Sequence, residues 1–138
     1  MKTFSILTVL FLSLILISCG KDESSGNSLY QTWEAKNFIS FESVTYPKNE
    51  NTSVLLTFKT DGTYSLKLDI NSCSGSFISE KSNQLEIGAP ACTEACCDSK
   101  FSGKLASVLS GVTSFRIEGR TLKLDVPQWG YIEFELVK

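Results

Sequence analysis

The sequence predicts a mainly β domain, an antiparallel sheet of about eight strands curled toward a small barrel, with one short helix. Three observations predict this fold. From Leu29 onward, apolar residues mostly alternate with polar ones, as in strands with one buried face. The turn signals Asp61-Gly62 and Gly119-Arg120 separate such runs. One segment, ahead of Gly111, has helical spacing instead.

The first predicted hairpin joins residues 54–59 and 64–70 through Asp61-Gly62. In the second of these runs, Tyr64, Leu66, Leu68 and Ile70 share one face, opposite Ser65, Lys67 and Asp69. Other apolar residues are assigned to early strands (Trp33, Phe38 and Phe41) and to middle strands (Phe77, Leu85 and Ile87).

A second hairpin is predicted at the C-terminal end. Phe115 and Ile117 alternate with charged residues before Gly119-Arg120, and alternation resumes over residues 122–126. Residues 131–137 form the expected closing strand. The helix is predicted from an i, i+4, i+7, i+8 stripe, with Asp98 as its N-cap and Gly111 as its stop: Phe101, Leu105, Val108 and Leu109.

Charge and composition exclude several classes of function. The chain has 138 residues, 13 Lys and Arg against 15 Asp and Glu, and a net charge of −2, which argues against a nucleic-acid partner. It contains no His, so Ser-His-Asp and Cys-His catalysis are excluded. No cofactor-binding loop is present, so no cofactor is expected.

The N-terminus has the pattern of a secretory signal peptide over residues 1–18. Lys2 precedes an apolar run over residues 4–17, which is shorter than the ~20 residues of a stable membrane span. The end of the run, Leu16-Ile17-Ser18-Cys19, resembles the lipobox of bacterial lipoproteins, which implies lipid on Cys19 and cleavage before it.

Residues 19–28 read as a lipidated cysteine followed by a polar tether, ahead of a domain over residues 29–138. Gly20 stands where an Asp is often associated with inner-membrane retention, which favours the outer membrane. Lys21-Asp22-Glu23 resembles a short surface-export signal, while a plain soluble linker is the alternative. We therefore expect an outer-membrane lipoprotein, periplasmic or surface-exposed, bound to the membrane through Cys19.

Four further cysteines, Cys73, Cys92, Cys96 and Cys97, are expected to form two disulfides outside the cytoplasm. Adjacent Cα atoms lie about 3.8 Å apart, below the usual disulfide range, so a Cys96–Cys97 bond is disfavoured. Two pairings stay open: Cys73–Cys97 with Cys92–Cys96, or Cys73–Cys96 with Cys92–Cys97. A zinc site built from the four thiolates is the alternative, although adjacent cysteines lack the usual ligand spacing.

Residues 29–138 resemble the META/HslJ-like family of small β-rich domains. The resemblance rests on an Asn…Gly…aromatic signature, a Thr…Cys-Asp stretch ahead of a helix, and several strand and turn positions: Trp33, Phe58, Asp61-Gly62, Asn71, Gly75, Phe77, Thr93, Cys97, Asp98, Leu122 and Leu124. It implies the barrel-like fold and an association with heat-shock response and drug tolerance. It transfers no catalytic residue.

This chain departs from the family pattern at one cysteine. The family places a Cys directly before the Asn, where this chain has Ile70, and Cys73 follows Asn71 by two residues. Positions 70 and 73 face opposite sides of a strand, so the family's cysteine geometry is not transferred.

The residues favour a non-catalytic envelope binding or stress-related module over an enzyme. The acidic candidates for catalysis occupy outward positions or turns, each alone: Asp61, Glu86, Glu118, Asp125, Glu133 and Glu135. A carboxylate-based hydrolase is one alternative. The other is a carbohydrate- or peptide-binding accessory lipoprotein, with Trp129 and Tyr131 as ligand contacts and Tyr46 as a further aromatic. Core packing or barrel closure is the competing role for Trp129. An envelope protein or a glycan is the expected partner.

Overall fold

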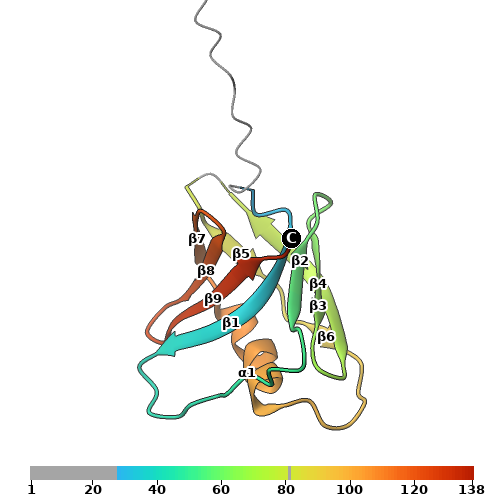
Figure 1. Ribbon diagram of the computed structural model, residues 1–138. Helices are drawn as coiled ribbons and strands as arrows, with labels where there is room; N and C mark the ends of the chain where they lie inside the picture. The colour runs from blue at the N-terminus through green and yellow to red at the C-terminus, as the bar shows by residue number, and fades with distance from the viewer. Residues whose placement is uncertain (1–27, 81) are drawn as a thin grey trace, which may run out of the picture.

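In the computed structural model, which describes residues 28–80 and 82–138, nine strands form one antiparallel sheet (Figure 1). The strands are β1 (Thr32–Ser40), β2 (Leu55–Phe58), β3 (Thr63–Lys67), β4 (Ser72–Ser79), β5 (Leu85–Ile87), β6 (Ala91–Cys92), β7 (Ser114–Glu118), β8 (Thr121–Val126) and β9 (Gly130–Leu136). The predicted signal peptide, Cys19 and the tether up to residue 27 lie outside the described residues.

The sheet is nearly closed into a barrel, which confirms the predicted fold class. Its strand order is β5-β4-β3-β2-β1-β9-β8-β7, with β6 paired to β4 outside this path. At the seam, Gln84 bridges to Ser114, and backbone N–H groups of Leu85 and Phe115 donate to Thr113 and Asn83 at 3.0 Å. The two end strands therefore meet through a few hydrogen bonds rather than a full ladder.

Both predicted hairpins are confirmed. β2 pairs with β3 around Gly62, and β7 pairs with β8 around Gly119. The two glycines have φ of +81° and +61°, values that favour a residue without a Cβ. The turn residues thus direct the chain back at the two places where the sequence pattern is strongest.

A register shift in β1 explains how Trp33 and Phe38 both contribute to the core. They are five residues apart and would face opposite sides of a regular strand. The pairing of β1 with β9 shifts between Ala35 and Asn37, which restores Phe38 to the inner side. The assignment of Phe41 to an early strand was wrong, because β1 ends at Ser40 and Phe41 is 87% exposed.

The core fills the barrel from all sides of the sheet. Its inward side chains include Trp33, Leu56, Phe58, Tyr64, Leu66, Leu122, Leu124, Ile132 and Phe134. The Trp33 indole N–H donates to the Leu29 carbonyl at 3.0 Å, so the largest of these residues is also satisfied as a donor.

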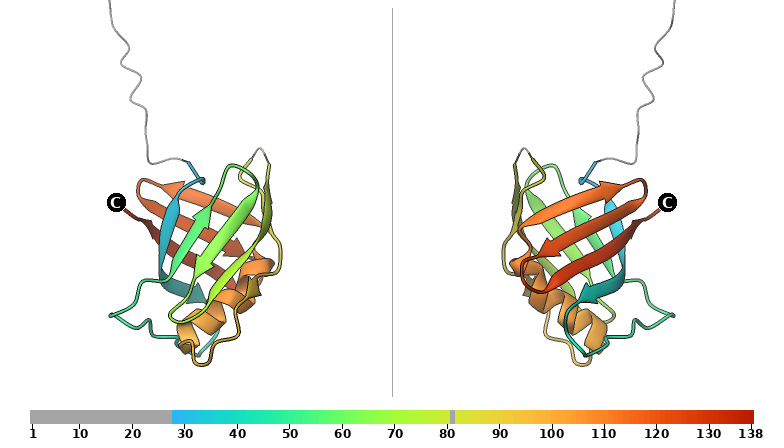
Figure 2. Two further views of the ribbon diagram at one scale, coloured as in Figure 1. Left: turned by 90° about the vertical axis from the view of Figure 1, so that its right-hand side faces the viewer. Right: turned by 90° about the vertical axis from the view of Figure 1, so that its left-hand side faces the viewer.

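Helix α1 (Lys100–Val108) and the 3-10 turn η1 (Leu109–Gly111) cover one end of the barrel (Figure 2). Phe101, Leu105 and Leu109 are buried there, as the stripe predicts. The predicted N-cap was wrong by one residue: Ser99 caps the helix by accepting from the Ser102 N–H at 3.2 Å. Asp98 is turned away to other donors. Neither helix in the described ranges has the length and apolar character needed to span a bilayer.

Candidate functional site

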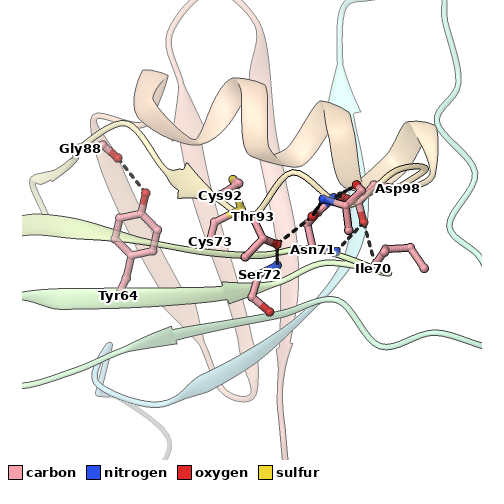
Figure 3. The surroundings of a disulfide bond; sticks show 10 residues. Tyr64, Ile70, Asn71, Ser72, Cys73, Gly88, Cys92, Thr93 and Asp98 are labelled. Carbon is pink, nitrogen blue, oxygen red and sulfur yellow. Dashed lines mark hydrogen bonds between the residues drawn. A yellow bond between two sulfur atoms is a disulfide. The ribbon is translucent and has the colours of Figure 1, made fainter.

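Asn71 is the centre of a hydrogen-bond network that joins the β3–β4 turn to the loop ahead of α1 (Figure 3). Its Nδ2 donates to the Ala95 carbonyl at 2.7 Å and to Asp98 Oδ2 at 2.6 Å. Its Oδ1 accepts from Thr93 Oγ1 and from the Ala95 N–H, both at 2.8 Å. Asn71 is 8% exposed, and both the nitrogen and the oxygen of its side-chain amide are hydrogen-bonded. Its role is therefore to hold the loop against the turn.

Asp98 and Thr93 complete this connection through backbone amides. Asp98 Oδ1 accepts from the N–H groups of Ile70 at 2.8 Å and Asn71 at 3.1 Å. Thr93 Oγ1 accepts from the Ser72 N–H at 3.1 Å. The residues of the Asn…Thr…Asp signature therefore hold one loop in place.

Asp69 lies beside this network and connects the turn between β3 and β4 to the start of α1. Its Oδ2 accepts from the Ser99 N–H at 3.0 Å and from Ser102 Oγ at 2.7 Å, and its Oδ1 accepts from Thr52 Oγ1 at 2.5 Å. Burial raises the pKa of Asp69, but hydrogen bonds from Ser99, Thr52 and Ser102 outweigh it and lower the pKa to about 2.

The pKa of Asp98 is also lowered. Burial raises it, and hydrogen bonds from the Asn71 side chain and from the backbone of Ile70 and Asn71 outweigh that effect, while the nearby Asp69 charge opposes them. Sequence reasoning did not find this pair of carboxylates, because residues 69 and 98 meet only after β4 and its following loop have folded back. Both groups are ionised at neutral pH, which suits hydrogen-bond acceptors and not a general acid.

Gly75 and Tyr64 fit together across the β3–β4 ladder. They are paired in register, and a Cβ on Gly75 would lie 2.7 Å from the Tyr64 ring. The Tyr64 hydroxyl donates to the Gly88 carbonyl at 2.9 Å. Phe77, two residues after Gly75, packs edge-to-face on Phe58 with ring centroids 4.9 Å apart. The glycine and the aromatic residue of the signature therefore serve packing.

The cysteines are paired differently from both predictions. Cys73 is bonded to Cys92, and Cys96 is bonded to Cys97. The first bond follows from the pairing of β6 with β4. This pairing places Cys92 opposite Cys73, with their Cα atoms 3.9 Å apart (Figure 3).

The adjacent pair, which the distance argument disfavoured, has Cα atoms 3.7 Å apart, and Cys97 has a φ of +88°. The prediction that Cys96 and Cys97 do not bond to each other was therefore wrong. Because all four side chains are in disulfides, they offer no thiolates for the alternative zinc site. Among the described residues, no group of three or more His, Cys, Asp or Glu is placed to hold a metal ion.

The geometry of the signature residues agrees with a comparison of the sequence with protein families. A family model for the META domain matches residues 27–134. The chain belongs to the META domain family. This confirms the resemblance seen in the sequence, and the network of Asn71, Thr93 and Asp98 gives this META domain's motif a structural role.

Two solved structures share the fold of this META domain. A DUF4847 family protein from Bacteroides vulgatus is 16% identical with a TM-score of 0.59, over 78% of this chain and 92% of that one. A protein from Burkholderia xenovorans is 15% identical with a TM-score of 0.64, over 79% of this chain and 83% of that one. No match was found among curated proteins. These likenesses support the fold alone.

The two aromatic residues predicted as ligand contacts are not brought together. Trp129 is half-buried and packs edge-to-face on Phe38 at 5.8 Å, with Lys104 Nζ 5.1 Å from its ring. Tyr131 lies on the outer side of β9 beneath Arg116 and Lys123. Trp129 and Tyr131 therefore have different surroundings, and a ligand contact by either residue stays a prediction.

Trp129 belongs to an aromatic and charged cluster that holds the loop after β1. Tyr46 packs edge-to-face on Phe38 at 5.9 Å, and Lys104 Nζ lies 5.2 Å from the Tyr46 ring. Lys104 also binds Glu42 at 2.8 Å. The buried Trp129 Nε1 makes no hydrogen bond of normal geometry, although the indole N–H contributes, after Lys104, to the lowered pKa of Glu42. The packing role of Trp129 is the one that the geometry favours.

The outward carboxylates stay apart, as expected. Glu118 pairs with Lys123 and Asp125 with Arg116, each at 2.7 Å. Asp61 accepts from Thr63 in its own turn. Glu86 and Glu135 are exposed, and Glu133 is half-buried on the outer side of β9. These groups form ion pairs and turns on the surface of the barrel.

A hollow runs beside the second half of β1. Its volume is about 470 Å³, and we call it the β1 groove. It is lined by residues 36–40 on one side and by Glu42 and residues 44–48 on the other. Ile39 and Val44 in its wall are 44% and 60% exposed, and Phe41 beside them is 87% exposed. Sequence reasoning missed this surface because it assigned Phe41 to a strand, whereas β1 ends at Ser40.

A smaller hollow of about 310 Å³ lies at the seam between β5 and β7. Ile78, Leu85 and Val112 contribute its apolar wall. The hydrogen bonds that close the seam use the backbone there, so this hollow is a consequence of incomplete barrel closure.

Proposed function

We propose that this META domain protein is an outer-membrane lipoprotein, periplasmic or surface-exposed, that works as a non-catalytic binding module for an envelope protein or glycan. Anchorage is proposed through lipid on Cys19, from the lipobox-like residues 16–19. A polar tether of about ten residues would span roughly 17–19 Å by random-coil scaling, enough to hold a small domain clear of lipid headgroups.

The observation that carries the proposal is the exposed apolar surface beside the β1 groove. Phe41 is the most exposed large apolar residue of the described chain, and the exposed residues Ile39 and Val44, two and three positions from it along the chain, line the groove. Neighbouring apolar side chains left in water, next to a hollow, are typical of contact surfaces. A single exposed apolar residue elsewhere, such as Ile70 in the turn between β3 and β4, lines neither hollow.

The placement of this surface suits an anchored module. The first described residues enter the barrel at the end opposite α1, and the loop over residues 41–54 lies at the α1 end (Figure 1). A tether attached at residue 28 would therefore reach the membrane from the end of the barrel far from the groove. The groove would then face away from the bilayer and toward other envelope components.

The carboxylates support a non-catalytic role over the alternative of a carboxylate-based hydrolase. Such a hydrolase needs one carboxyl group whose pKa is raised so that it can donate a proton. The pair that the fold brings together, Asp69 and Asp98, has lowered pKa values, and its oxygens accept hydrogen bonds from the protein.

Two measurements test the proposal. Cys19→Ser is expected to abolish acyl labelling and to move the protein from the membrane fraction to the soluble fraction. A photo-reactive benzoylphenylalanine in place of Phe41 is expected to cross-link the protein to an envelope protein or glycan in intact cells. The matched position is Ile70, which is 58% exposed in the turn between β3 and β4, lines neither hollow and should give no discrete product. Unchanged membrane association of Cys19→Ser, or equal cross-linking at both positions, would contradict the proposal.

A further inference from the structure

β1 is paired along its full length on one side only. It pairs with β9 from Trp33 to Ser40. On its other side it pairs with β2 at Thr32–Glu34, and the Ala35 N–H then donates to the Val54 carbonyl at 2.9 Å. Among the described strands, none pairs with this second edge over residues 36–40. The β1 groove lies along that open edge.

The alternation of an antiparallel ladder identifies the backbone groups that face the groove. The Phe41 N–H donates to the Trp129 carbonyl at 3.1 Å, so Phe41 faces β9. Hydrogen-bonded pairs recur every second residue, which directs the backbone groups of Ile39 and Asn37 toward β9 as well. The N–H and C=O groups of Phe38 and Ser40 point to the open edge.

The groove walls show that the hollow follows the strand edge and not one face of the sheet. All five residues from Lys36 to Ser40 line it, although neighbours in a strand face opposite sides. Residues 44–48 form the opposite wall. That wall is held by Lys48 bound to Glu34 at 2.6 Å, and by the Phe38–Tyr46 contact. The space between the two walls is therefore maintained by packing and an ion pair.

The charges along the groove are already balanced within the protein. Lys36 and Lys48 both bind Glu34 at 2.6 Å, Lys36 also binds Glu135 at 3.4 Å, and Lys104 binds Glu42, so three lysines face three carboxylates. An occupant consequently needs no net charge. The exposed side chains of Ile39 and Val44 line the groove and offer apolar contacts instead, and exposed Phe41 directly follows β1.

We propose that the β1 groove binds an extended, uncharged and partly apolar peptide segment of a partner protein, which adds as a strand to the open edge of β1. This inference rests on the proposed binding function and names its partner class. A row of backbone donors and acceptors at strand spacing is complementary to another polypeptide backbone, and a glycan or lipid does not repeat that spacing. Residues 36–40 offer a pairing length of about 17 Å, at about 3.4 Å per residue.

The test selects peptides from a phage-displayed library of random dodecamers on the full chain, and then follows backbone amide exchange residue by residue. In the free protein, the amides of Phe38 and Ser40 are expected to exchange fast and those of Asn37 and Ile39 slowly. A selected synthetic peptide should slow exchange at Phe38 and Ser40 by on the order of tenfold or more, because each amide gains a hydrogen bond. Asn37 and Ile39 should not change.

N-methylation of the peptide and a pair of protein variants isolate the backbone contribution. Methylating alternate amides of the peptide in one register should weaken binding by roughly tenfold, while the other register is tolerated, because only every second amide faces β1. Ser40→Pro removes one edge N–H and should weaken binding, whereas the matched Ser40→Ala keeps that N–H and should bind normally. The methylated peptides keep the test decisive if Ser40→Pro fails to fold.

Three outcomes would overturn strand addition. These are a library that yields no binding peptide, a peptide that binds without slowing Phe38 and Ser40, and equal tolerance of both N-methylation registers. Slow exchange at both amides in a peptide-free dimer would instead assign the edge to a second copy of this chain, and would also overturn the proposal. None of these results affects the Cys19 and Phe41 experiments, so failure of this inference is distinguishable from failure of the proposed function.

Discussion

Asn71 and Asp98 are joined twice across 27 residues of chain. The Asn71 side-chain amide donates to Asp98 Oδ2 at 2.6 Å, and the Asn71 backbone N–H donates to Asp98 Oδ1 at 3.1 Å. Together they attach the loop that carries Cys96 and Cys97, and the start of α1, to the turn between β3 and β4.

Asn71→Ala is expected to lower the free energy of unfolding by about 2–3 kcal/mol, because it leaves buried partners without their hydrogen bonds. The matched control is Asn51→Ala, at an exposed loop position, which should change stability by less than about 0.5 kcal/mol. Urea unfolding followed by Trp fluorescence measures both. Equal stability of the two variants would contradict the structural role assigned to Asn71.

Asp69→Asn is expected to remove part of the pH dependence of stability. The folded pKa of Asp69, about 2, lies below its ordinary value of 3.8, so its stabilising contribution is fully present above about pH 4. That contribution is lost as the pH falls through 2. The variant should therefore be less stable than the wild type at pH 7, by about 1–2 kcal/mol, and similar to it near pH 2. Thermal unfolding across this range measures the difference, and a difference that does not change with pH would contradict the assignment.

Gly75→Ala and Gly103→Ala are expected to have opposite effects. A Cβ on Gly75 would meet the Tyr64 ring at 2.7 Å, within a strand pair that cannot separate, so the variant should lose about 1–3 kcal/mol. A Cβ on Gly103 meets nothing within 4 Å, in an exposed position of α1, so this variant should gain about 0.5–1 kcal/mol. Denaturant midpoints measure both changes. Destabilisation of similar size at both glycines would show that the close approach to Tyr64 is not the cause.

The disulfide connectivity is expected to appear in a non-reducing digest with proteases that cut after Lys and Glu. The peptide over residues 68–80 should be linked to residues 87–94, because Cys73 is bonded to Cys92. Residues 95–100 should be released separately, two hydrogen masses lighter than the reduced form, because Cys96 and Cys97 are bonded to each other. A single product that contains all three peptides would restore the pairings predicted from sequence. Cys92→Ser is expected to cost about 3 kcal/mol through loss of the loop constraint.

Local patterns in the sequence were sufficient for the hairpins and for the helix. Gly62 and Gly119 adopt positive φ between runs that alternate regularly, so the chain reverses at these points whatever the rest of it does. The helical stripe likewise requires Phe101, Leu105 and Leu109 to face one side. Both signals are set by neighbours in the chain, which is why the two hairpins and the position of the helix could be predicted.

Features that depend on register could not be predicted in the same way. The shift between Ala35 and Asn37 decides the face on which Phe38 lies, and it has no local sequence signal. The end of β1 at Ser40 leaves Phe41 in solvent, where alternation alone assigned it to a strand. The open edge beside these residues is known only once β2 is seen to pair with no more than the first part of β1.

By itself, the sequence determined the β class, the two hairpins, the helix and the META resemblance, because these depend on periodicity, turn residues and spacing along the chain. Only the tertiary structure decided that Cys73 meets Cys92, that Asp69 and Asp98 are gathered as hydrogen-bond acceptors, and that Trp129 and Tyr131 separate. Each of these is a contact between segments far apart in sequence, or a direction set by strand pleat. Such contacts depend on which residue of one strand lies opposite which residue of another, and a slip of a single residue would change all of them.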